Sequence, residues 1–188
     1  MENNMINELF VQFNDLVDSL IKDFKEFNQN EEVLVFLAGK TKNFLDFTEL
    51  TFLNVIFKFL SQIDTVNKEF SKEIEQSEEL IRRVFENIRS ILERIVIEDE
   101  EEEHGHSHGC GHSHGLEHHQ HIDMDGVQED LEKIVDDLVF LKKLVATIGD
   151  IVFSSLKYKA DEISQIEYEE EYERFKDKIM KYYDEFNF

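Results

Sequence analysis

Two stretches of the chain repeat apolar residues at alternating spacings of four and three, and this rhythm limits the possible folds more than any other feature. The first stripe has one polar member and comprises Phe70, Ile74, Ser77, Ile81, Val84, Ile88, Ile91 and Ile95. The second has none and comprises Val127, Leu131, Ile134, Leu138, Leu141, Val145, Ile148 and Val152. This spacing aligns each stripe along one face of an α-helix about 38 Å long, at ~1.5 Å per residue. Each stripe therefore predicts a long amphipathic helix.

Two matched helices separated by a connector predict an antiparallel helical hairpin, coiled-coil-like along its seam. Its helices are expected at residues 65–97 and 126–158, and the connecting loop at residues 98–125. In an alternative interpretation, both stripes are core faces of a larger bundle and the connector only joins them. Both interpretations place the connector in a solvent-exposed position at the tip of the two helices.

The rest of the chain predicts further helices and an all-α fold. Proline is absent, which favours helices over a turn-rich β architecture. Residues 1–64 are expected to form N-terminal helices. Within them, "NEEVLVFLAGK" predicts a short helix capped by Gly39, or alternatively a strand, and "DFTELTFLNVIFKFLSQI" predicts another helix with an Asp/Thr start signal. Residues 161–188 predict a C-terminal helix. Residues 1–188 are thus expected to form one helical-bundle domain of five or six helices, with the two longest extending as an arm.

The charge balance restricts the possible partners. A formal net charge of −23, from 43 acidic and 20 basic residues, argues against binding to nucleic acid or to an anionic membrane, since both would repel the chain. The apolar run "VLVFLA" is far shorter than a membrane span, so no membrane insertion is expected. The stretch "MENNMINELF" lacks the features of a secretory signal, and a single cysteine cannot form an internal disulfide. These features predict a soluble, acidic, cytoplasmic protein.

All eight histidines and the single cysteine lie in one acidic segment, "EDEEEEHGHSHGCGHSHGLEHHQH", at residues 98–121. Residues 105–115 read the same in both directions around Cys110. Each half supplies a His-Ser-His pair, and in an extended chain residues two apart project to the same side. The candidate metal ligands are His104, His106, His108, Cys110, His112, His114, His118, His119 and His121.

These residue types are the ligands that transition metals prefer. Four imidazoles, or three with a thiolate, complete a four-coordinate shell for zinc, and imidazole-rich sites also accept nickel and copper. The glycines between the histidines let the chain fold around an ion. An unbroken run of six carboxylates at residues 98–103 concentrates divalent cations nearby. Glu117, Asp123 and Asp125 are weaker additional candidates.

The histidine segment resembles the His-rich loops of zinc-transporting membrane proteins and the His-rich tracts of nickel chaperones and metal-storage proteins. The resemblance covers residues 104–121 only and implies metal handling, with Zn²⁺ or Ni²⁺ as the bound ion or cargo. We therefore predict a metallochaperone, buffer or sensor that acts through a mobile His/Cys-rich loop. Its expected partners are divalent metal ions and a metal-recipient protein. A cluster shared between two chains would give a homodimer.

Two alternatives remain open. The helices can form an interaction or scaffold surface with the histidine segment as a passive linker, or the imidazoles can act as a pH-responsive element near ~6.5. An enzyme is not expected, because Cys110 has no partner base on a rigid element. The stretch "AGKTKN" does not form a phosphate-binding loop, since the required first glycine is Leu34.

Overall fold

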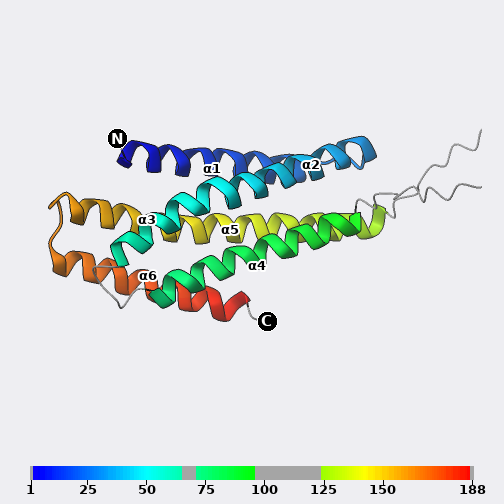
Figure 1. The fold of residues 1–188 in the computed structure, drawn as a ribbon. Helices are drawn as coiled ribbons and strands as arrows, with labels where there is room; N and C mark the ends of the chain where they lie inside the picture. The colour runs from blue at the N-terminus through cyan, green and yellow to red at the C-terminus, as the bar shows by residue number, and fades with distance from the viewer. Residues whose placement is uncertain (1, 65–70, 96–123, 187–188) are drawn as a thin grey trace, which may run out of the picture.

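The computed structural model describes residues 2–64, 71–95 and 124–186, and these residues form helices joined by short turns, with no strand (Figure 1). The helices in chain order are α1 (Glu2–Lys25), α2 (Glu31–Phe47), the π-helix η1 (Thr48–Leu53), α3 (Asn54–Asp64), α4 (Ser71–Ile95), α5 (Met124–Lys159) and α6 (Gln165–Phe186). The prediction of an all-α fold is confirmed. The alternative of a strand within "NEEVLVFLAGK" is wrong, because this stretch belongs to α2.

The segment α2–η1–α3 is one continuous helix, which corrects two predicted boundaries. Gly39 does not cap a helix, because the helical spacing of the buried Leu37 continues beyond Gly39 with Thr41 and Phe44, which are also buried. The polar Thr41 tolerates burial because its hydroxyl donates to the Leu37 carbonyl at 2.8 Å. The predicted start near Thr48 is also wrong, since the Thr48 hydroxyl donates in the same way to the Phe44 carbonyl at 2.8 Å. Thr48 is therefore a polar residue inside the helix and does not mark its start.

The ends of α2 and α6 are set by side-chain caps. At the start of α2, the Asn30 side chain accepts a hydrogen bond from the Val33 amide at 3.2 Å. Before α6, the Glu167 carboxylate accepts from the Ser164 amide at 2.8 Å, and the Glu167 amide donates to the Ser164 hydroxyl at 3.3 Å. This reciprocal pair is a capping box, which explains why α6 begins at Gln165.

Helix α5 lies at the centre of the bundle and packs against α1, α4 and α6 (Figure 1). It runs antiparallel to α4. Asn87 donates a hydrogen bond to Asp137, and Arg94, later on α4, donates to Asp130, which is earlier on α5. Helix α1 approaches α5 closely at Gly149, where an added Cβ would lie 3.1 Å from Cε1 of Phe10. The prediction that α4 and α5 extend as an arm is not confirmed, because α5 is covered by three other helices.

The two apolar stripes account for much of the core. All eight residues of the second stripe are buried, as are Ile81, Val84, Ile88, Ile91 and Ile95 of the first. Ser77, the polar member, is buried as well, and its hydroxyl donates to the Ile74 carbonyl at 2.8 Å. Phe70 lies outside the described residues. The stripes are therefore core faces of a bundle, as in the alternative interpretation of the sequence.

Phenylalanines of α1 and of the continuous helix α2–η1–α3 complete this core. The ring of Phe52 lies 5.1 Å from that of Phe10, edge to face, and 5.0 Å from that of Phe13. On α6, buried tyrosines keep polar partners: the Tyr172 hydroxyl donates to Glu73 at 2.8 Å, and the Tyr168 hydroxyl shares a hydrogen bond with Ser155. Buried residues of all these helices form one continuous apolar cluster.

Candidate metal centre

All nine candidate ligands, from His104 to His121, lie outside the described residues, as do Glu117 and Asp123. The predicted metal ligands therefore stay a prediction from the sequence. Among the residues that the structure does describe, no group of three or more His, Cys, Asp or Glu side chains is placed to hold a metal ion. The structure does describe the two helix ends, at Ile95 and Met124, between which the histidine segment lies.

The end of α4 and the start of α5 are anchored side by side. Ile95 and Val127 are 4% and 5% exposed, so the last described side chain of α4 is in the core, as is a side chain of the first turn of α5. The Arg94 guanidinium donates to the Asp130 carboxylate at 3.0 Å and links the two helices directly. Residues 96 and 123 therefore follow and precede helix ends that lie at the same end of the bundle (Figure 1).

The positive charges at this end are already matched by carboxylates. Arg94 and Lys133 are the basic residues nearest to the histidine segment on either side. The Lys133 ammonium lies 2.9 Å from Glu129 and 3.5 Å from Asp130, the residue that also binds Arg94. The hydrogen bond to Glu129 is the largest of the effects that raise the pKa of Lys133. Because Arg94 and Lys133 are both paired with carboxylates, their positive charges repel a nearby divalent ion only weakly.

Asp137 is the most perturbed carboxylate at the seam between α4 and α5. It accepts a hydrogen bond from the Asn87 amide at 2.6 Å. Burial raises the pKa of Asp137 to about 6, the Asn87 hydrogen bond lowers it, and the neighbouring charge of Asp136 raises it further. Asp137 is not among the candidate residues predicted from the sequence. The available signal was its position between the stripe residues Ile134 and Leu138, which places it at the margin of the packed face.

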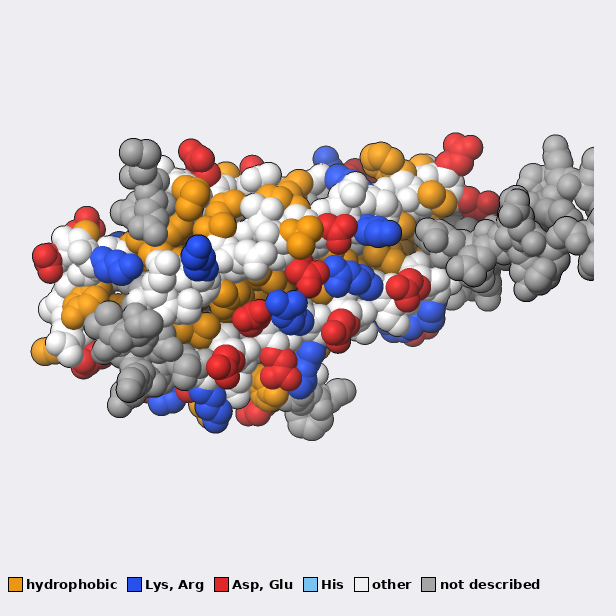
Figure 2. Space-filling view, in the orientation of Figure 1, with side chains coloured by type: hydrophobic (Ala, Val, Ile, Leu, Met, Phe, Trp, Pro, Cys, Tyr) orange, Lys and Arg blue, Asp and Glu red, His pale blue; other side chains and the backbone are white. Residues whose placement is uncertain are grey.

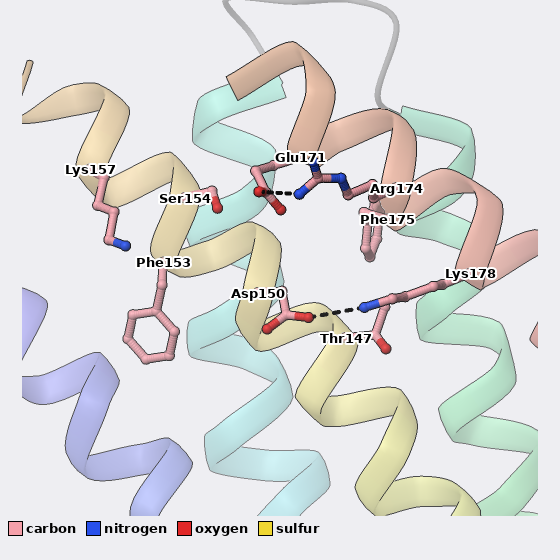
Figure 3. Close-up of a pocket in the computed structure, with 9 residues that line it drawn as sticks. All are labelled: Thr147, Asp150, Phe153, Ser154, Lys157, Glu171, Arg174, Phe175 and Lys178. Carbon is pink, nitrogen blue, oxygen red and sulfur yellow. Dashed lines mark hydrogen bonds and ion pairs between the residues drawn. The ribbon is translucent and has the colours of Figure 1, made fainter. Parts of the chain in front are cut away.

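A second polar site lies between α5 and α6 (Figure 3). Its cavity of about 440 Å³ is lined by Thr147, Asp150, Phe153, Ser154, Lys157, Glu171, Arg174, Phe175 and Lys178. Asp150 lies 3.2 Å from Lys178 across the two helices, and Glu171 lies 2.7 Å from Arg174 along α6. The Thr147 hydroxyl donates to the Lys143 carbonyl of its own helix. Paired carboxylates and cations of this kind are typical of a solvated seam between helices.

Comparisons with protein families, curated proteins and solved structures found no match for this chain. None of the described helices is both long enough and apolar enough to cross a membrane. The functional interpretation therefore depends on the chain's own residues.

Proposed function

We propose that this chain is a divalent transition-metal-binding protein that takes up nickel or zinc through residues 104–121 and acts as a metallochaperone, buffer or sensor. The observation that carries the proposal is the placement of every histidine and the only cysteine in that one segment. The described helices carry none of them, although they make up most of the chain. The side chains suited to Ni²⁺ and Zn²⁺ are therefore separated in sequence from those that build the core.

The chemistry of the segment suits reversible capture of an ion. An unperturbed imidazole titrates near ~6.5, so at neutral pH most of these histidines can donate a lone pair to a metal. Cys110 would bind as the thiolate, since metal binding releases the thiol proton. The carboxylates of residues 98–103 raise the local concentration of divalent cations.

We further propose that α4, residues 96–123 and α5 together form a helical hairpin with the metal site at its tip. The antiparallel contact of the two helices and the Arg94–Asp130 ion pair support this arrangement. A metal held there would lie beyond the end of the bundle, where a recipient protein can reach it. The role of the bundle in this proposal is to fix the two ends of the segment.

The proposal is tested by titrating metal-free protein with Ni²⁺ and Zn²⁺ in a calorimeter. The test variant replaces His106, His108, His112 and His114 with Asn and Cys110 with Ser. We expect its metal affinity to fall by at least about 100-fold, because ligand loss costs at least as much as the loss of an outer-shell partner.

The matched control variant replaces His118, His119 and His121 with Asn, which removes three imidazoles but leaves the symmetric centre intact. We expect this control to keep most of the affinity of the natural chain. If a third variant, with all eight histidines replaced by Asn and Cys110 by Ser, binds both ions as tightly as the natural chain, the metal proposal fails and the passive-linker interpretation is favoured.

A further inference from the structure

Helix α2 carries apolar side chains on its outer surface. Val35 is 54% exposed and Phe36 is 67% exposed, and Figure 2 shows hydrophobic side chains at the surface over this helix. Beside them, a groove of about 480 Å³ runs between α2 and α4 and is lined by Val35, Ala38, Gly39, Lys42, Arg89, Leu92 and Glu93. The groove combines apolar side chains with charged ones, so it suits a partner that presents both kinds.

The groove is open at its centre. An added Cβ on Gly39 would meet no atom within 4 Å, so the backbone of α2 is accessible to another helix there. Small side chains at a crossing point let two helices approach closely. Val35 projects from the same face one helical turn before Gly39. This face therefore has both a side chain that can insert into a partner and a space that can accept one.

Charges flank this apolar centre with opposite sign. Glu31 and Glu32 form the first turn of α2, and both are exposed. Lys42 is exposed near the other end of the groove, about 15 Å from Glu32 along the helix at ~1.5 Å per residue. Within the described part of the chain, neither Glu32 nor Lys42 makes an ion pair. By contrast, Lys40 is held by Asp23 on α1.

We propose that this face binds a second copy of the chain, with the two α2 helices packed antiparallel about a two-fold axis at the level of Leu37. Positions 35 and 39 are symmetric about 37, so Val35 of each copy packs over Gly39 of the other. Positions 32 and 42 are also symmetric about 37, so Glu32 of each copy faces Lys42 of the other. A two-fold interface requires this self-complementarity of one patch, and the charge pattern of α2 provides it.

A second copy fits this surface better than an unrelated acidic partner, because the required positions of carboxylate and ammonium are those that α2 itself presents. Arg89, the other cation in the groove, already binds Glu49 at 2.7 Å and lies 3.6 Å from Asp46. The overall charge of −23 opposes association, and one helix pair is a small interface. The dimer is therefore weak, and it forms without metal.

The test is sedimentation equilibrium of the full chain in a chelating buffer, so that metal-bridged association does not contribute. The natural chain is expected to form dimers as its concentration is raised from micromolar towards millimolar. Glu32→Lys and Lys42→Glu are each expected to weaken association by about tenfold or more, because each places like charges opposite one another.

An equimolar mixture of the two variants distinguishes this interface from any other. One variant presents two lysines and the other two glutamates at the paired positions, so the mixture regains association that neither variant has alone. Circular dichroism checks that both variants remain helical. A natural chain that stays monomeric, or a mixture no more associated than its components, overturns the proposal and leaves the groove to a different partner.

Discussion

The helical bundle and the histidine segment differ in almost every property of their side chains. The bundle buries Leu, Ile, Val and Phe and pairs its surface charges, as at Arg94–Asp130, Lys142–Asp18 and Arg82–Glu78. Residues 98–121 contain every imidazole, the only thiol and no Lys or Arg. Under the proposed function, folding and ion binding depend on separate sets of residues. Each can then be altered without the other.

A substitution that leaves a cavity in the core tests whether the bundle can be destabilised without changing metal binding. It has the largest expected effect on stability. Leu138 is fully buried on the central helix α5. Leu138→Ala is expected to lower the free energy of unfolding by about 2–5 kcal/mol, because it removes buried methyl groups and leaves a cavity. Urea denaturation measures this loss, and calorimetric titration measures metal affinity under folding conditions.

The matched control is Leu50→Ala, because Leu50 is 71% exposed. This substitution should change stability by no more than about 0.5 kcal/mol. Both variants should bind metal as the natural chain does. A folded Leu138→Ala protein with greatly weakened metal binding would contradict the separation of the two regions.

Two of the helical glycines, Gly149 and Gly39, differ in how tightly the bundle packs around them. At Gly149 an added Cβ would lie 3.1 Å from Phe10, whereas at Gly39 it would meet nothing within 4 Å. We expect Gly149→Val to cost about 1–3 kcal/mol through overpacking between α1 and α5. Gly39→Val should be neutral or slightly stabilising, since any side chain lowers the entropic cost that glycine imposes on a helix. Equal midpoints of thermal unfolding for the two variants would show that α1 and α5 can move apart at Gly149 without cost.

Asp137→Asn has the smallest expected effect and a defined pH dependence. The pKa of Asp137 is raised from 3.8 to about 6, chiefly by burial, so the folded protein binds this proton more tightly than the unfolded chain. The ionised carboxylate therefore destabilises the fold above about pH 6, and this penalty disappears as the pH falls below about 4. Asparagine keeps an acceptor for Asn87 without the charge.

We expect Asp137→Asn to raise the free energy of unfolding at pH 7 by on the order of 1 kcal/mol, reduced by the partial exposure of the side chain. Chemical denaturation at pH 4 and pH 7 measures the difference. The exposed Asp15→Asn serves as control and should change stability at neither pH. A gain for Asp137→Asn that is as large at pH 4 as at pH 7 would exclude burial of the charge as its cause.

The sequence predicted the apolar faces of α4 and α5 well, because residue spacing alone determines which side of a helix is apolar. Every described member of these stripes except the partly exposed Ile74 is buried. The boundary at Gly39 was wrong, since a glycine in a helix signals a local cost and does not show whether the following residues reach the core. The helix continues because Thr41 and Thr48 are buried in the core. Their burial depends on hydrogen bonds from their hydroxyls to carbonyls of their own helix.

Features that depend on how the helices pack against one another could not be predicted from the sequence. The pKa of Asp137 depends on how α4 covers it, and the groove beside α2 depends on where α4 lies relative to that helix. The proposed metal ligands differ, because they were predicted from the sequence alone. Their residue types and spacing are complete in the sequence, while residues 104–121 lie outside the described residues. The proposed metal site is therefore supported by composition and chemistry, and the helical bundle by the geometry of the described residues.

The most direct test of the central claim is elemental analysis of the full chain purified without an affinity tag and without added metal. The variant that lacks the four histidines around Cys110, and Cys110 itself, is purified in parallel. We predict nickel or zinc at one ion or more per natural chain and little or none in the variant. Equal metal contents in the two proteins would contradict the claim that Cys110 and the four histidines around it hold the ion. No transition metal in the natural chain would contradict the claim that residues 104–121 bind metal.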